Sequence, residues 1–107
     1  MPKYKKVNEI DVLIEYYKTQ SISNKCGLWC DYIPIKNMAI ILETSDYQIQ
    51  KAYKSLKEKG LMEIIKFPIY FEEYYNGLYD VVVPILYSKV YVISKKGEEY
   101  LKDIVKE

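Results

Sequence analysis

The segment between Ser45 and Gly60 constrains the fold of this chain more than any other stretch of its sequence. Serine is a residue type that caps the start of a helix, because its hydroxyl accepts a hydrogen bond from a free amide of the first turn. Glycine commonly ends a helix, because it adopts the left-handed conformation without strain. The two residues therefore predict a helix from about Asp46 to Lys59.

The predicted helix has two different sides. Apolar residues recur along one side at steps of three and four positions: Ile49, Ala52, Tyr53 and Leu56. The opposite side carries Tyr47, Lys51 and Lys54, with Gln48 and Gln50 on its flanks. Because an ordinary surface helix needs only its apolar side in order to pack, the opposite side is the candidate for a binding function.

Two more helices are predicted before Ser45. The first covers residues 7–18 and has its apolar set on one face: Ile10, Leu13, Ile14 and Tyr17. A polar loop containing Gly27 is predicted from Thr19 onward. The second helix covers about residues 35–43, because Pro34 favours a position at the start of a helix. Its apolar set is Met38, Ala39, Ile41 and Leu42.

A hairpin and a last helix are predicted after Gly60. The runs LMEIIKFPIYF and VVVPILYSKVYVIS have the β-branched and aromatic composition of strands. Asn76-Gly77 between them is typical of a tight turn. Pro68 and Pro84 predict edges, bends or bulges, since proline cannot donate a ladder hydrogen bond. The last helix is predicted from about Lys95, with its apolar side formed by Tyr100, Leu101, Ile104 and Val105.

The order helix, helix, helix, strand, strand, helix is that of a winged helix-turn-helix. We therefore expect a single α+β domain over residues 1–107, with three helices, a two-stranded wing and a C-terminal helix. The helix-turn-helix would cover about residues 35–59, the wing about 61–94 and the C-terminal helix about 95–106. In such a fold the third helix presents its outer side to the DNA major groove.

The chain resembles the winged-helix transcription regulators of the MarR type and their small archaeal and archaeal-virus relatives. The resemblance is carried by NMAIILETSDYQIQKAYKSLKEKGLMEI and, after the wing, by YVISKKGEEYL. The family's Leu-Ala pair, capping serine, helix core and strand start are matched by Met38-Ala39, Ser45, Ile49, Leu56 and Gly60-Leu61-Met62. Ser94-Lys95-Lys96-Gly97 matches the family's entry into its final helix.

The resemblance implies a sequence-specific regulator that binds double-stranded DNA, expected to be a homodimeric repressor without a cofactor. Five residues stand where the family contacts DNA: Ser45, Tyr47, Gln48, Gln50 and Lys51. Lys36 and Lys54 are expected at phosphates, and Lys66 and Lys89 are the candidate contacts of the wing. Glutamine can bond adenine through two hydrogen bonds, and lysine can reach guanine or phosphate. Apolar stripes on the first and last helices are both candidate dimer interfaces.

The wing departs from the family pattern. Residues 67–88 contain Glu72, Glu73 and Asp80 but no lysine, a local charge of −3 that phosphates would repel. The whole chain carries only +1, and its basic residues are lysines without any arginine. An alternative function therefore stays open, in which the acidic, tyrosine-rich wing binds a partner protein and the third helix is merely solvated.

The absence of histidine limits the chemistry of this chain. It removes the usual Ser-His and Cys-His nucleophile pairs and the imidazole ligands of metals, so we expect neither an enzyme nor a metal site. Cys26 and Cys30 are too few for structural zinc and stand one residue further apart than in a Cys-x-x-Cys redox motif. A disulfide between them, a disulfide between subunits and two reduced thiols all stay open.

The hydrophobic pattern predicts a protein outside the membrane. No apolar run approaches the roughly 18 to 20 residues that a spanning helix needs. The basic N-terminus is followed by an amphipathic pattern rather than by the core of a signal peptide. We therefore expect a cytoplasmic location, in the host cell if the source is a virus.

Overall fold

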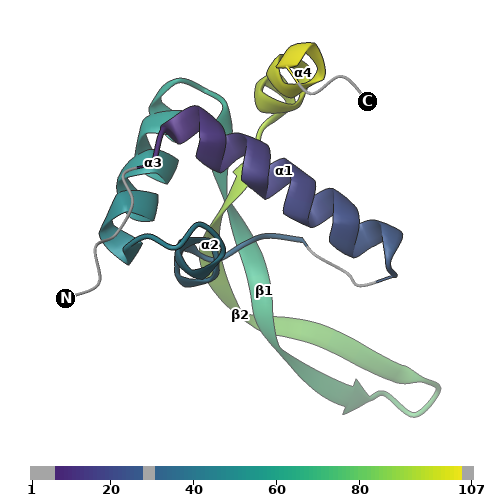
Figure 1. The fold of residues 1–107 in the computed structure, drawn as a ribbon. Helices are drawn as coiled ribbons and strands as arrows, with labels where there is room; N and C mark the ends of the chain where they lie inside the picture. The colour runs from purple at the N-terminus through teal and green to yellow at the C-terminus, as the bar shows by residue number, and fades with distance from the viewer. Residues whose placement is uncertain (1–6, 28–30, 105–107) are drawn as a thin grey trace.

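The computed structural model describes residues 7–27 and 31–104 (Figure 1). Within these residues the chain forms an α+β fold of four helices and a two-stranded antiparallel hairpin, in the predicted order. The elements are α1 (Glu9–Lys25), α2 (Ile35–Ile41), α3 (Asp46–Glu58), β1 (Met62–Tyr75), β2 (Asp80–Ile93) and α4 (Lys95–Ile104). Figure 1 shows the helices gathered near one end of the hairpin, whose other end projects away from them. This arrangement is compatible with a winged-helix layout.

Helix α1 continues to Lys25, so the loop predicted from Thr19 onward is wrong. Its start is capped by Asn8, whose side-chain oxygen accepts from the amide of Ile10 at 2.9 Å. The polar residues after Lys18 stay helical because the tertiary context overrides their weak preference for loops. The stop comes at Gly27, which has a φ of +79° and donates its amide to the carbonyl of Asn24.

The buried face of α1 is also rotated from the predicted one. Leu13 is buried as expected, but it lies with Val12 and Tyr16, and not with the other predicted residues. Ile10, Ile14 and Tyr17 are only partly buried at the edge of the core. Tyr16 is drawn inward because its hydroxyl finds hydrogen-bonding partners inside the fold, as described below.

Helix α2 ends at Ile41, two residues before the predicted Glu43. Glu43 instead has a φ of +53°, which turns the chain toward α3. The following amide, of the buried Thr44, donates to the carbonyl of Ala39 at 2.9 Å. Met38 and Ala39 are buried as predicted and Leu42 is partly buried against the core, whereas Ile41, the last residue of the helix, is exposed.

Helix α3 confirms the prediction made from its two ends and its apolar side. The hydroxyl of Ser45 accepts from the amide of Gln48 at 3.3 Å. At the other end Gly60 has a φ of +78° and donates to the carbonyl of Lys57, while Leu61 donates to that of Leu56. This pair of bonds is the Schellman motif, which satisfies carbonyls that the helix leaves free. All four predicted apolar residues are buried: Ile49, Ala52, Tyr53 and Leu56.

Replacing Ser45 with alanine is expected to lower the free energy of unfolding by about 1 kcal/mol, because the amide of Gln48 loses its capping acceptor. Urea denaturation followed by circular dichroism measures this change. The matched control is Ser55→Ala in the middle of α3, where alanine favours the helix. Equal stability of the two variants would contradict the capping role.

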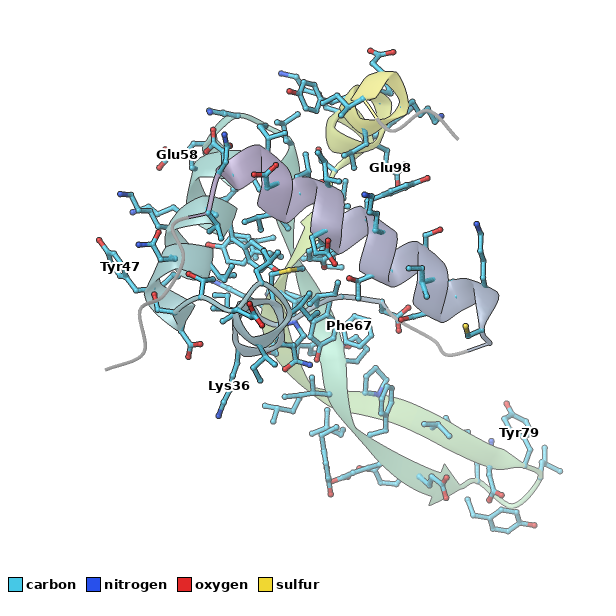
Figure 2. The ribbon with its side chains drawn as sticks, in the orientation of Figure 1. Lys36, Tyr47, Glu58, Phe67, Tyr79 and Glu98 are labelled. Atoms are coloured by element: carbon cyan, nitrogen blue, oxygen red, sulfur yellow. The ribbon has the colours of Figure 1, made fainter. Side chains whose placement is uncertain are left out.

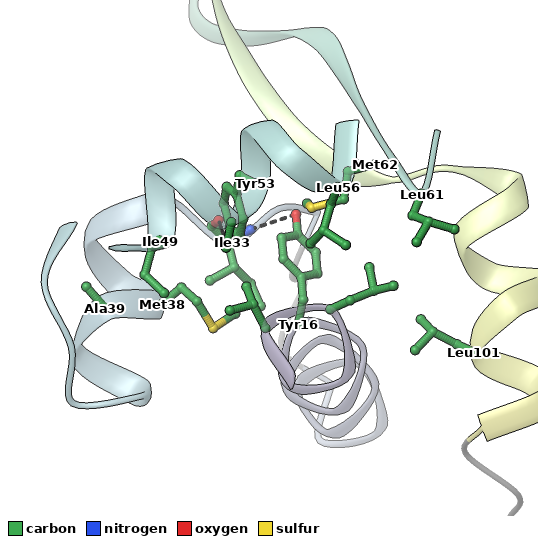
Figure 3. Packing of buried hydrophobic residues seen from close by; sticks show 13 residues of the cluster. Tyr16, Ile33, Met38, Ala39, Ile49, Tyr53, Leu56, Leu61, Met62 and Leu101 are labelled. Atoms are coloured by element: carbon green, nitrogen blue, oxygen red, sulfur yellow. Dashed lines mark hydrogen bonds between the residues drawn. The ribbon is translucent and has the colours of Figure 1, made fainter. Parts of the chain in front are cut away.

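Two buried tyrosine hydroxyls bind backbone groups outside their own helices (Figure 3). The hydroxyl of Tyr16 in α1 donates to the carbonyl of Tyr91 in β2 at 2.7 Å and accepts from the amide of Ile33 at 3.0 Å. The hydroxyl of Tyr53 in α3 donates to the carbonyl of Ile33 at 2.9 Å. Both backbone groups of Ile33 are therefore satisfied by side chains in the segment that leads into α2, as buried polar groups require.

The hydrophobic core lies between the helices and the base of the hairpin. Figure 3 shows its residues from α1, α2 and α3 around Tyr16 and Tyr53, whose ring centroids are 5.8 Å apart. Leu61 and Met62 extend it into β1, and Leu101 of α4 closes its far side. The predicted apolar side of α4 is therefore only partly buried, because Tyr100 and Ile104 are exposed; Val105 lies outside the described residues.

The hairpin has the turn and the irregularities that its sequence predicts. The side-chain oxygen of Asn76 accepts from the amides of Leu78 and Tyr79, each at 3.0 Å, and Gly77 has a φ of +93°. The register shifts just after Pro68 and again between Tyr70 and Phe71. In the second shift the partner changes from Leu86 to Pro84. The prolines therefore stand beside bulges, as expected.

Candidate nucleic-acid interface

The side of α3 opposite the core is exposed. Tyr47 has 69% of its surface exposed, and Lys51 and Lys54 are also exposed. Because they follow one another at steps of four and three residues, the three side chains share one stripe. Figure 2 shows Tyr47 pointing away from the body of the molecule. The predicted stripe is thus brought together, and Glu58 lies at its far end.

The two glutamines lie on different flanks of the stripe. Gln48 is half-buried and, with Lys51, lines a hollow of about 270 Å³ beside the start of α1. Gln50 is exposed and stands seven residues before Lys57, so these two share the other flank. Gln50 is therefore more accessible than Gln48, a difference that the sequence pattern did not predict.

The base of the hairpin adds lysines on the second flank. Lys66 and Lys89 stand directly opposite each other in the β1–β2 register. They line a hollow of about 610 Å³ together with Lys57 of α3 and one carboxylate, Glu63. Like charges directly opposite in a hairpin repel each other, so an anion in this hollow would stabilise the pair.

Lys57 was not among the residues predicted to bind. The spacing of seven residues between Gln50 and Lys57 indicated that the two share one flank of α3. The closeness of Lys57 to Lys66 and Lys89, however, depends on how the hairpin packs against the helix. Lys36, by contrast, is exposed in the first turn of α2 as expected, and Figure 2 shows it pointing away from the hairpin. Lys59 is directed elsewhere, since it forms an ion pair with Glu9 at the start of α1.

The acidic part of the hairpin lies far from these lysines. Glu72, Glu73 and Asp80 belong to the outer end of the hairpin, next to the turn at Tyr79 (Figure 2). The hydroxyl of Tyr74 donates a hydrogen bond to Glu72, and this bond raises the pKa of Tyr74 above its usual value. Tyr74 therefore stays protonated and neutral at physiological pH, and the negative charge of this end comes from its carboxylates.

Two other predictions concern cysteines and metals. Cys26 is exposed, whereas Cys30 lies outside the described residues, so a disulfide between them stays a prediction. In the part of the chain that the structure describes, His, Cys, Asp and Glu form no group of three that would hold a metal ion. Among the described helices, none combines the length and the apolar character that crossing a membrane requires.

Five lysines thus form a basic strip along α3 and the base of the hairpin: Lys51, Lys54, Lys57, Lys66 and Lys89. Tyr47 and Gln50 accompany the strip with exposed polar groups that can form hydrogen bonds. Because the opposite, apolar side of α3 packs in the core, the basic strip lies on the outer side of the molecule. Comparison of the chain with protein-family models, with curated proteins and with solved structures found no match.

Proposed function

We propose that the protein is a winged-helix transcription regulator that binds duplex DNA with α3 in the major groove. The observation that supports this function is the exposed stripe of Tyr47, Lys51 and Lys54, which lies opposite the core stripe of the same helix. The major groove is about 12 Å wide and admits one helix. A helix whose inner side is fixed by a core can present its outer side there without rearrangement.

The residues around the stripe would divide into two roles. Tyr47 and Gln50 carry hydrogen-bonding groups that can read base edges, and a glutamine amide matches the donor and acceptor of adenine. The basic strip would contact phosphates, which orient the protein on the duplex but carry no sequence information. The hollow lined by Lys57, Lys66 and Lys89, with Glu63 as its carboxylate, would be a place for a backbone phosphate. Lys36 would contact the backbone from α2.

The proposed mode requires no cofactor and no catalytic step. Occupying a promoter would itself block transcription, so repression is the simplest outcome of binding. The acidic outer end of the hairpin would have to stay off the phosphates, and its projection away from the helices is compatible with this (Figure 1). The DNA contacts of the hairpin would then come from its base and not from its tip.

Charge reversal on α3 tests this proposal. The variant Lys51→Glu/Lys54→Glu is expected to bind duplex DNA from upstream of its own gene at least tenfold more weakly than the unaltered protein. The measurement is fluorescence anisotropy over a salt series, in which each phosphate contact contributes about −0.9 to the slope of log K against log salt. A smaller slope in the variant would indicate that phosphate contacts were removed.

A matched control distinguishes the effect of this face of α3 on DNA affinity from the effect of net charge. Lys18→Glu/Lys25→Glu makes the same charge change on exposed positions of α1 and is expected to bind as the unaltered protein does, within about twofold at moderate salt, where distant charges are screened. An unrelated duplex of equal length measures specificity. Equal losses in the two double variants, or equal affinity for both duplexes, would contradict sequence-specific binding through α3.

A second candidate function is favoured by the outer end of the hairpin, which exposes aromatic and aliphatic side chains. In this alternative the protein is an interaction module and α3 is only solvated. It would be supported if the Lys51→Glu/Lys54→Glu variant kept full activity in the cell while changes in the hairpin abolished it.

A further inference from the structure

The outer part of the hairpin, residues 70–87, is here named the hairpin arm. Eleven large apolar side chains of the arm are between 36% and 85% exposed. They are Tyr70, Phe71, Tyr74, Tyr75, Leu78, Tyr79, Val82, Val83, Ile85, Leu86 and Tyr87. Figure 1 shows the arm extending beyond the helices. Just before the arm begins, the ring of Phe67 contacts that of Tyr32, with 4.9 Å between their centroids.

Both faces of the arm are apolar. Residues paired across the hairpin share a face, so Phe71 and Pro84 mark one face, and Tyr74 and Val81 mark the other. A sheet with one solvated face shows alternating apolar and polar residues, whereas near-continuous apolar runs are typical of strands covered on both faces. The arm has such runs, in Val81–Val83 and Ile85–Tyr87. Its sequence is therefore that of a covered sheet.

The strand edges of the arm point to the same conclusion. Proteins commonly protect long exposed edges with lysine, but residues 67–88 contain none. A two-stranded hairpin alone is only marginally stable in water. The arm is thus long, apolar on both faces and without edge lysines, although Pro84 and the bulge between Tyr70 and Phe71 give its edges some protection. These features favour a role as a contact surface.

The exposed area is large enough for a stable interface. The aromatic side chains of the arm, of about 150–250 Å² each and roughly half exposed, together present on the order of 600 Å², and the aliphatic side chains add to this area. The largest patch on a typical monomer is about 300–600 Å². A standard interface takes about 800 Å² from each partner. One arm could therefore supply one side of a standard interface.

The charge distribution indicates what covers the arm. The whole chain carries +1 and residues 67–88 carry −3, so the remaining residues carry +4. An acidic arm is repelled by nucleic acids and by anionic lipid surfaces, whereas it is attracted to the basic remainder of another copy. A two-fold axis places each arm against the same surface of the other copy, so both arms are covered at once.

We infer that the hairpin arm is the dimerisation element of this protein and packs against a second copy of the chain. The inference rests on the apolar faces, area and charge of the arm, and it does not depend on DNA binding. It differs from the expectation that α1 or α4 forms the interface. Those helices expose fewer large apolar side chains: Ile22 on α1, and Tyr100 and Ile104 on α4.

Sedimentation equilibrium of the full chain without DNA, from 1 to 100 µM, tests this inference at concentrations on the scale of ordinary dimer affinities. The unaltered protein is expected to be a dimer. Val82→Lys/Leu86→Lys introduces charge on two half-exposed arm positions and should weaken the dimer at least tenfold. Lysine at position 82 lies opposite Glu73, an arrangement that stabilises the hairpin itself. Loss of the dimer would then not reflect a melted arm.

The control variant is Ile22→Lys/Tyr100→Lys, which makes the same charge change on exposed apolar positions of α1 and α4. It should leave the dimer unchanged, and circular dichroism should show equal helix content in all three proteins. A monomeric unaltered protein overturns the inference, as does dissociation by the control variant and not by the arm variant. Binding of a monomeric chain to neutral phosphatidylcholine vesicles would also overturn it and assign the arm to lipid.

The two proposals fail separately. The Lys51→Glu/Lys54→Glu variant should remain a dimer whatever its affinity for DNA. The arm variant, even as a monomer, keeps the basic strip and should still bind a single half-site with a clear dependence on salt. Loss of the dimer alone therefore supports the role of the arm, and loss of DNA binding alone supports the role of α3.

Discussion

Replacing Gly97 with alanine is expected to lower the free energy of unfolding by about 4 kcal/mol or more, which is a large share of the about 5–15 kcal/mol that stabilises a typical domain. An added Cβ at this position would lie 2.1 Å from the carbonyl oxygen of Leu61 and 2.9 Å from Cγ2 of Ile93. The first of these is backbone and cannot rotate away. Helix α4 could accept the methyl group only by moving off β1.

That movement would break a junction between α4, α3 and the hairpin. The hydroxyl of Ser94 accepts from the amide of Gly97 at 3.0 Å and donates to the carbonyl of Gly60 at 2.5 Å. The amide of Ser94 also donates to the carbonyl of Leu61 at 3.1 Å. The close approach of the glycine thus lets one serine cap α4 and hold it to the end of α3.

Gly77→Ala is the control for Gly97→Ala. Gly77 has a φ of +93°, but a Cβ there would meet no atom within 4 Å. Gly77→Ala should therefore lower the free energy of unfolding by only about 1–2 kcal/mol, which is the cost of a left-handed conformation for a residue other than glycine. Thermal and urea unfolding compare the two variants. If Gly97→Ala were no less stable than Gly77→Ala, α4 would not approach Leu61 as closely as the structure places it.

The parts of the fold that could be predicted from sequence depend on short-range chemistry. Ser45 caps a helix through an amide three residues away, Gly60 ends it through its own backbone, and Asn76 forms its turn within three residues. Each interaction is contained in a few consecutive residues, so the residue types alone indicate it. The apolar side of α3 was equally predictable, since its period is fixed by helical geometry.

The parts that could not be predicted depend on residues far apart in the chain. The hydroxyl of Tyr16 binds backbone groups 17 and 75 residues away. Periodicity therefore assigned Tyr17 to the core in its place. The same holds for the candidate site: the lysines of α3 were predicted from their spacing, but the meeting of Lys57 with Lys66 and Lys89 requires the docked hairpin.

Tyr16→Phe is expected to lower the free energy of unfolding by about 2–4 kcal/mol, although it removes a single oxygen atom. Two backbone groups lose their partner: the amide of Ile33, which donates to this hydroxyl, and the carbonyl of Tyr91, which accepts from it. A buried polar group left without a partner costs about 1–3 kcal/mol. Tyr53→Phe should cost less, because its hydroxyl donates to one backbone group, the carbonyl of Ile33, whereas that of Tyr16 serves two.

Tyr17→Phe is the control on the same helix, at a half-buried position whose hydroxyl is outside this network, and should change stability by less than about 0.5 kcal/mol. The double variant Tyr16→Phe/Tyr53→Phe should cost less than the sum of the single variants. Both hydroxyls hold Ile33, so once one variant has released this residue, the second substitution has less left to disrupt. Urea denaturation gives all four values. Strict additivity, or equal stability of the Tyr16 and Tyr17 variants, would contradict the role of Ile33 as the point where α1 and α3 jointly hold the start of α2.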